Sequence, residues 1–177
     1  MTELDPSKIR VVAFDLFGTV FDMSNVPRAE IVAYIDHIEK PEWSPLDLPA
    51  SWESCPPHAD AGEGIERLRF RYRAVTCSNG PLETLWSLSR NGDIEWDAIV
   101  PLEARRVFKP HPRAYLTVPI VCCVEPSQVL MVTGNPKLGR KDYGDVEAAR
   151  AVGMQSVLIR GESDIPDIIA LAERLGC

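Results

Sequence analysis

The sequence predicts an α/β fold, in which an open parallel sheet is flanked by helices and one small insertion follows the first strand. Three observations predict it. Short, continuously apolar runs recur along the chain, segments with helical apolar spacing lie between them, and a proline-rich stretch after the first run interrupts the alternation. Continuous apolarity is typical of strands that are covered on both faces, and strand–helix alternation is typical of parallel sheets.

The apolar runs are the predicted strands. Four of them cover residues 10–15, 73–78, 128–133 and 155–160, and a fifth, less apolar run covers residues 98–101. Because such sheets bind ligands beyond the carboxyl ends of their strands, the residues that end or follow each run are the first candidates for chemistry.

Helices are predicted between the strands, where apolar side chains recur on one face. The recurring positions are Ile65, Leu68 and Tyr72; Leu82, Leu85, Trp86 and Leu88; Val146, Ala149 and Val152; and Ile165, Ile168, Ile169 and Leu171. This spacing matches the period of an α-helix, so these segments are expected to cover the sheet.

The predicted insertion follows the first strand. It begins with a helix over Pro27–Lys40, and a proline-rich segment with Trp43 and Trp52 comes next. We interpret residues 23–56 as a small cap over the strand ends, with residues 1–22 and 57–177 forming the core domain. Eight acidic and two basic side chains lie between residues 22 and 60, so most of the net charge of −7 belongs to this region.

Composition narrows the range of partners. The 19 basic and 26 acidic side chains argue against binding to nucleic acid, because a polyanion is held by a cationic surface. No apolar run approaches the roughly 20 residues that span a bilayer, and the first ten residues lack a secretory signal. We expect a cytoplasmic protein, monomeric or homodimeric, with no membrane partner.

Five segments near the strand ends match motifs of a known family. They read, in order, VVAFDLFGTVFD, TCSNG, FKPHPRAY, VLMVTGN and DVEAARAVGM. In these segments the chain resembles the haloacid dehalogenase superfamily of hydrolases, over nearly its whole length. The resemblance implies a Rossmann-like core, a cap inserted after the first strand and a small-molecule substrate.

The predicted nucleophile is Asp15, the last residue of the first predicted strand. A carboxylate there can attack carbon or phosphorus and form an ester or acyl phosphate that water later cleaves. Lys109, in the KP context of the family, is the expected charge partner, and a cation within about 4 to 6 Å lowers a carboxylate pKa. A carboxylate that only caps a turn and a solvated surface lysine are the structural alternatives.

Further side chains are expected to contact the substrate. Ser78 and Asn79 come just before the helix predicted over residues 81–90, and the start of a helix is a natural anion site. The structural alternative is an ordinary helix cap, which favours the same residue types. The remaining expected contacts are Phe17, Thr19, Thr133 and Asn135.

Phe17 departs from the phosphatases of the family. Most of them carry at this position a second aspartate, which protonates the leaving oxygen, and a phenyl ring cannot do so. The dehalogenase branch has an aromatic residue here, because a departing halide needs no proton. Asn79 and Asn135 also agree with the dehalogenase branch.

Asp145 is the predicted base for hydrolysis of the ester. The segment between Asn135 and Asp145 is longer than the family usually has, so Asp142 competes for this role, and a helix N-cap is the structural alternative for either acid.

Two other functions stay open. A magnesium-dependent phosphatase would hold the ion through Asp15, the Phe17 carbonyl and Asp145, whereas dehalogenase relatives need no metal. The short cap counts against a dehalogenase, since it offers only Arg28 and Lys40 where the dehalogenases use a cap arginine for the halide. A non-catalytic relative would instead bind a ligand or partner through Trp43 and Trp52.

Overall fold

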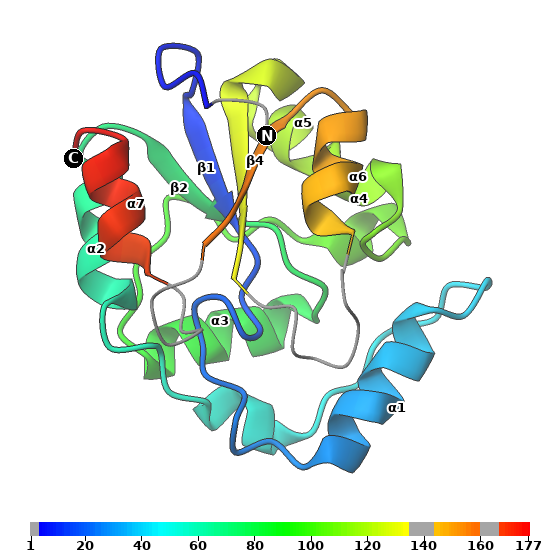
Figure 1. Cartoon of the computed structure of the whole chain (residues 1–177). Coiled ribbons are helices and arrows are strands. Elements are labelled where there is room, and N and C mark those ends of the chain that lie inside the picture. The colour runs from blue at the N-terminus through cyan, green and yellow to red at the C-terminus, as the bar shows by residue number, and fades with distance from the viewer. Residues whose placement is uncertain (1–3, 135–143, 160–166) are drawn as a thin grey trace.

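A single sheet of four parallel strands forms the centre of the molecule (Figure 1). The computed structural model describes residues 4–134, 144–159 and 167–177. The strands are β1 (Val11–Phe14), β2 (Arg73–Thr76), β3 (Val129–Thr133) and β4 (Gln155–Leu158), in the order β2-β1-β3-β4. The predicted α/β class with a parallel sheet is confirmed.

The fifth predicted strand, over residues 98–101, is wrong. Only one parallel bridge joins Ala98 to Val75 there, with the N–H of Thr76 donating to the Ala98 carbonyl at 3.2 Å. The N–H of Val100 donates instead to the Thr76 side-chain hydroxyl at 2.9 Å, and Pro101 has no N–H at all. The ladder therefore stops after one bridge.

Helices cover both faces of the sheet (Figure 1). One core cluster receives side chains from α2 (Ala61–Arg69), α3 (Leu82–Asn91) and α7 (Ile168–Arg174), and the other from α4 (Pro112–Tyr115), α5 (Thr117–Cys122) and α6 (Asp145–Ala151). Strand β1 serves both, because Val12 and Phe14 point into the first cluster and Val11 and Ala13 into the second. Short 3-10 turns lie at residues 50–54, 102–105 and 126–128.

The apolar face predicted for α3 is narrower than its sequence indicates. Leu85 and Leu88 are fully buried, but Leu82 and Trp86 are 46% and 52% exposed. Of the four apolar positions predicted to form the buried face of α3, two are buried and two are exposed. Ile165, from the last predicted helix, lies outside the described residues.

The insertion leaves and re-enters the core at one place. Phe21 and Pro57 form an antiparallel bridge, the N–H of Asp22 donates to the Pro56 carbonyl at 2.8 Å, and the N–H of His58 donates to the Val20 carbonyl at 2.9 Å. The segment between them holds α1 (Arg28–Ile38), slightly shorter than predicted, and it lies beyond the end of β1 (Figure 1).

Three aromatic rings join the insertion to the core. Trp52 is fully buried, and its ring centroid lies 5.1 Å from that of Phe17 and 5.3 Å from that of Tyr34. The Trp52 indole N–H donates to Glu30 at 2.9 Å. Trp43 is half-buried and also packs against this core. The burial of Trp52 makes it a packing residue, which removes one of the two features on which the non-catalytic alternative depends.

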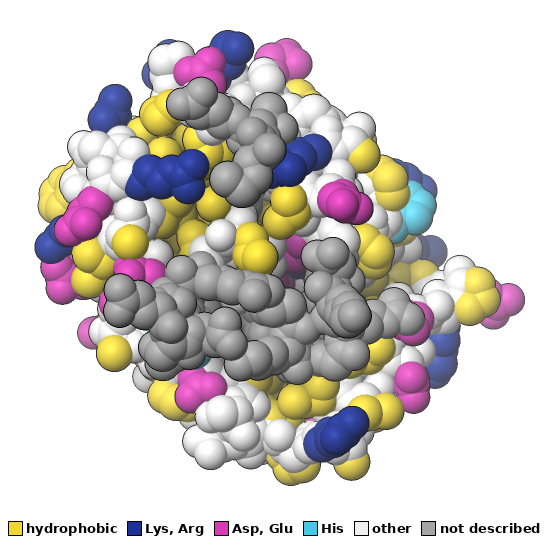
Figure 2. Space-filling model, viewed as in Figure 1, with side chains coloured by type: hydrophobic (Ala, Val, Ile, Leu, Met, Phe, Trp, Pro, Cys, Tyr) yellow, Lys and Arg dark blue, Asp and Glu magenta, His cyan; other side chains and the backbone are white. Residues whose placement is uncertain are grey.

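Acidic and basic side chains are interspersed with hydrophobic ones on the face drawn in Figure 2. Among the residues that the structure describes, no helix is both long and apolar enough to cross a bilayer.

Candidate active site

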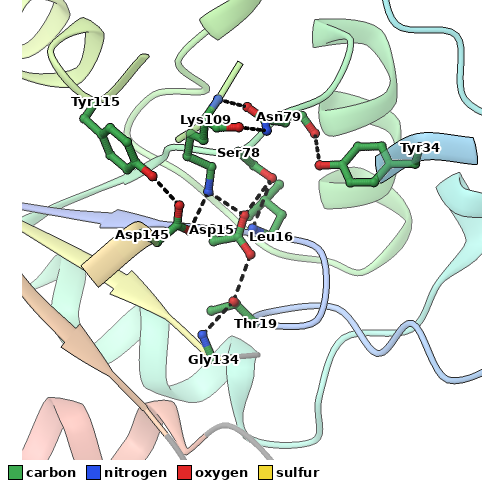
Figure 3. Close-up of polar contacts among 10 residues, drawn as sticks. All are labelled: Asp15, Leu16, Thr19, Tyr34, Ser78, Asn79, Lys109, Tyr115, Gly134 and Asp145. Atoms are coloured by element: carbon green, nitrogen blue, oxygen red, sulfur yellow. Dashed lines mark hydrogen bonds and ion pairs between the residues drawn. The ribbon is translucent and has the colours of Figure 1, made fainter. Parts of the chain in front are cut away.

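Asp15 lies where the carboxyl ends of three strands meet. It follows β1, the strand between β2 and β3, so Ser78 beyond β2 and Thr133 at the end of β3 lie at the same edge of the sheet. The Ser78 hydroxyl donates to Asp15 Oδ1 at 3.2 Å and accepts from the N–H of Leu16 at 3.3 Å (Figure 3). The Asp15 side chain keeps 17% of its surface exposed.

Lys109 bridges two carboxylates. Its Nζ lies 2.8 Å from Asp15 Oδ1 and 2.9 Å from Asp145 Oδ2, and only 3% of its side chain is exposed (Figure 3). Burial alone lowers the pKa of Lys109, but the carboxylates of Asp145 and Asp15 outweigh burial and hold the pKa well above its usual range. Lys109 is therefore a fixed cation at the centre of the cluster.

The pKa of Asp15 differs from the expectation. The sequence predicts that Lys109 lowers it, and Lys109 does act in that direction at 2.8 Å. Burial has the larger effect, however, and it raises the pKa of Asp15 above its usual value, with the negative charge of Asp145 adding to the rise. The expected net lowering is wrong, because burial outweighs the effect of the Lys109 cation on the pKa of Asp15.

Thr19 holds the second oxygen of Asp15. Gly18, at a φ of +77°, makes the turn that brings Thr19 back toward the strand end. The fully buried Thr19 hydroxyl donates to Asp15 Oδ2 at 3.1 Å and accepts from the N–H of Gly134 at 2.8 Å. Thr19 thus links the ends of β1 and β3, and Thr133 beside it is 5% exposed.

The Asn79 side chain holds the backbone of Lys109. Its Nδ2 donates to the Lys109 carbonyl at 3.0 Å, and its Oδ1 accepts from the Lys109 N–H at 2.7 Å (Figure 3). The Asn79 carbonyl accepts from the Tyr34 hydroxyl at 3.4 Å. The amide expected to contact the substrate is therefore engaged with the chain itself, and its contact with substrate stays a prediction.

Asp145 faces the site, and Tyr115 is a site residue that the sequence analysis missed. Asp145 begins α6 and is 3% exposed, and the Tyr115 hydroxyl donates to its Oδ1. The only available signal was the position of Tyr115 within the FKPHPRAY motif, six residues after Lys109. Asn135 and Asp142 lie outside the described residues.

Phe17 packs instead of lining an open pocket. It is 2% exposed, with its ring against Trp52 and Tyr34. Arg28 and Lys40, the two basic side chains of the insertion, are both exposed. Within the described part of the chain, the cation nearest to the nucleophile is thus Lys109.

The carboxylates of this site do not fit a magnesium ion as they stand. Each oxygen of Asp15 and of Asp145 already accepts a hydrogen bond, and the Lys109 ammonium lies between the two groups. A cation bridging these carboxylates would need the place of the ammonium. In the described ranges no cluster of three His, Cys, Asp or Glu side chains is arranged to hold a metal.

Comparison with known proteins gives related dehalogenases. No family model matches the chain. An (S)-2-haloacid dehalogenase of Xanthobacter autotrophicus is 27% identical over an alignment of 200 residues, gaps included. The alignment covers 86% of this chain and 79% of that protein. Haloacetate dehalogenase H-2 of Moraxella sp. (strain B) is 27% identical over 117 residues, which cover 64% of this chain and 49% of that protein.

Solved structures share the fold. A defluorinating L-2-haloacid dehalogenase matches with a TM-score of 0.73 and 22% identity over 96% of each chain. The Xanthobacter autotrophicus L-2-haloacid dehalogenase with chloropropionic acid covalently bound matches with a TM-score of 0.68 and 21% identity, over 88% of this chain and 80% of that one. The motifs stand in the family's order, and these relatives support a hydrolase of the haloacid dehalogenase superfamily whose first motif resembles the 2-haloacid dehalogenase branch.

Proposed function

We propose that the chain hydrolyses the carbon–halogen bond of a small 2-haloacid through a covalent ester on Asp15. The observation that carries the proposal is the buried cluster in which Asp15 is held by Lys109, Ser78 and Thr19. A carboxylate fixed by three donors and still partly open to solvent is arranged to act as a nucleophile.

Phe17 supports a halide leaving group. An alcohol leaving from a phosphate ester takes up a proton, and an apolar ring at 2% exposure has none to give. A halide leaves with the bonding electron pair and needs no acid. The (S)-2-haloacid dehalogenase relative and the Xanthobacter structure with chloropropionic acid covalently bound support the same substrate class and a covalent step.

In the first proposed step, an Asp15 oxygen attacks C2 of the substrate. The new O–C2 bond forms as the C2–halogen bond breaks, and halide departs with the electron pair. We assign binding of the substrate carboxylate to Ser78 and to backbone N–H groups near the start of α3, where the helix dipole favours an anion. Thr133 and Asn135 complete the proposed substrate contacts.

In the second proposed step, water attacks the ester carbonyl of Asp15. The bond between that carbonyl carbon and the Asp15 oxygen that attacked C2 breaks, and the oxygen of water stays on Asp15. The departing oxygen leaves on the product and takes up a proton returned by the base, which gives the 2-hydroxyl group. We assign Asp145 to accept the proton from water. Its hydrogen bond from Tyr115 and its ion pair with Lys109 keep it oriented toward the nucleophile.

The phosphatase alternative has less support. It needs an acid for the leaving oxygen where Phe17 stands, and it needs Mg²⁺ where the Lys109 ammonium lies between Asp15 and Asp145. The dehalogenase reaction proposed here uses residues of the chain alone and no cofactor.

The test compares two substrates under matched conditions. Purified protein is assayed with (S)-2-chloropropionate for halide release and with an aryl phosphate for phosphate release, each with Mg²⁺ and with a chelator. Asp15→Asn is the control variant. We expect halide release that the chelator leaves unchanged and that Asp15→Asn abolishes; metal-dependent phosphate release without halide release would overturn the proposal.

A single turnover in heavy-oxygen water tests the covalent step. With enzyme in excess over substrate, the label should enter Asp15, and mass spectrometry of the peptide that contains it measures the incorporation. Label found only in the hydroxy acid product would instead indicate direct attack of water on C2.

A further inference from the structure

A cluster of arginines lies at the edge of the sheet opposite the candidate active site. Arg10, Arg69, Arg71 and Arg73, called here the arginine cluster, line a cavity of about 510 Å³ together with Phe70 and Gln128. No acidic side chain lines the cavity. The cluster is therefore a concentration of positive charge in a chain whose net charge is −7.

The sheet itself brings the cluster together. Arg10 precedes β1, Arg73 begins β2, and Gln128 precedes β3. The N–H of Arg73 donates to the Arg10 carbonyl at 3.1 Å, and the N–H of Arg10 donates to the Gln128 carbonyl at 2.8 Å. Asp15 follows the other end of β1, so the two sites are separated by the length of the strand. Several Lys and Arg side chains lie in the upper part of the face in Figure 2, where Figure 1 draws the start of β1.

Structural roles account for only part of this charge. The guanidinium of Arg71 donates to the Leu175 carbonyl at 3.1 Å and that of Arg73 to the Cys122 carbonyl at 2.9 Å, so each stabilises the end of a helix. A guanidinium has five N–H donors, and one bond leaves most of them available. Arg69 is paired with Glu95 and Asp97.

Arg10 and Phe70 have no structural role of this kind. Within the described residues, the Arg10 guanidinium makes no hydrogen bond or ion pair. Phe70 is 86% exposed, so its ring adds almost nothing to the core. An exposed aromatic ring beside the Arg10 guanidinium, with Arg71 and Arg73 only partly engaged, is the arrangement that holds a ligand with both a flat ring and negative charge.

We propose that the arginine cluster binds a small phosphorylated ligand of the nucleotide class. Phosphate oxygens accept from Arg10, Arg71 and Arg73, since the arginine fork matches phosphate geometry. The base of the ligand stacks on Phe70.

The test measures binding by calorimetry at low salt, with ATP and inorganic tripolyphosphate as the two probes. We expect ATP to bind in the micromolar range. Arg10→Gln should weaken ATP binding about tenfold, the loss of one charge-assisted contact. Phe70→Ala should weaken ATP binding several-fold and leave tripolyphosphate binding unchanged, because tripolyphosphate has no ring to stack.

Arg90→Gln is the matched control, since Arg90 is exposed on α3 and the variant has the same net charge as Arg10→Gln. It should change ATP affinity less than about twofold, because an exposed charge outside the site is screened by salt. Equal effects of Arg10→Gln and Arg90→Gln on ATP binding would overturn the proposal, as would the absence of ATP binding. Phe70→Ala keeps the test independent of folding, because the ring that it removes is exposed.

Discussion

The ring of Phe17 packs edge to face on the ring of Trp52, with 5.1 Å between their centroids. Phe17 lies two residues after the candidate nucleophile, and Trp52 belongs to the insertion. This contact and that of Phe17 with Tyr34 hold the insertion against the loop that carries Asp15. The position that carries a catalytic acid in phosphatases of the family is here part of the hydrophobic core.

Replacing Phe17 by Asp should unfold the protein more easily without creating a phosphatase. The variant would bury a carboxylate among aromatic rings, and we expect a loss of at least about 3 kcal/mol in the free energy of unfolding. Urea denaturation measures it. Phe17→Leu, which keeps the site apolar, should cost only about 1 to 2 kcal/mol. A soluble Phe17→Asp variant of unchanged stability that hydrolyses alkyl phosphates would contradict this account of Phe17.

Lys109→Met should abolish activity and destabilise the fold. It leaves the carboxylates of Asp15 and Asp145 buried without their cation, and breaking a buried pair costs about 3 to 5 kcal/mol. The added substitution Asp145→Asn removes one of the two negative charges that Lys109→Met leaves without a cation. The double variant should therefore be more stable than the sum of the single effects predicts, and thermodynamic additivity within about 0.5 kcal/mol would contradict the coupling.

The acid limb of the pH–rate profile should report Asp15. The nucleophile is active when ionised, and burial raises its pKa, so kcat/KM should begin to fall at a higher pH than the ordinary carboxyl pKa of 3.8. Thr19 donates to Asp15 and opposes this rise. Thr19→Val should therefore move the acid limb to still higher pH, whereas Thr19→Ser, which keeps the hydroxyl, should leave it in place.

Tyr115→Phe should slow the second step more than the first. The variant removes the donor to Asp145 Oδ1 and keeps the ring, so Asp145 loses orientation as the proposed base. We expect kcat to fall about tenfold or more and the ester on Asp15 to accumulate, which quenched-flow mass spectrometry detects as an added mass. A fall in kcat without any accumulated ester would assign Tyr115 to the first step instead.

The positions of several site residues could be predicted from the sequence, because polar residues end the apolar runs that form the strands. Asp15 and Ser78 are the last residues of two predicted strands, and parallel strands bring such residues to one edge of the sheet. The position of Lys109 could be predicted only from its motif. The weak strand predicted before it is not a strand in the structure, so strand ends do not indicate Lys109. The contact of Lys109 with Asp145 depends on where α6 begins, which no local pattern sets.

The roles of side chains were harder to predict than their positions. Tyr115 looks like one more apolar residue of a short helix, and only its hydrogen bond to Asp145 distinguishes it. Asn79 can bind substrate or backbone, and its pairing with both backbone groups of Lys109 is a tertiary relationship between distant segments. The net pKa shift of Asp15 likewise depends on burial, which a single sequence does not display.

The paired entry and exit of the insertion, where Phe21 meets Pro57, make it exchangeable. Hydrogen bonds between these two segments close the core where the insertion begins, so the insertion can change in length if Tyr34 and Trp52 keep their contacts with Phe17. Evolution or design can thereby change the insertion, and with it the range of substrates, while the residues of the lysine–carboxylate cluster keep their positions.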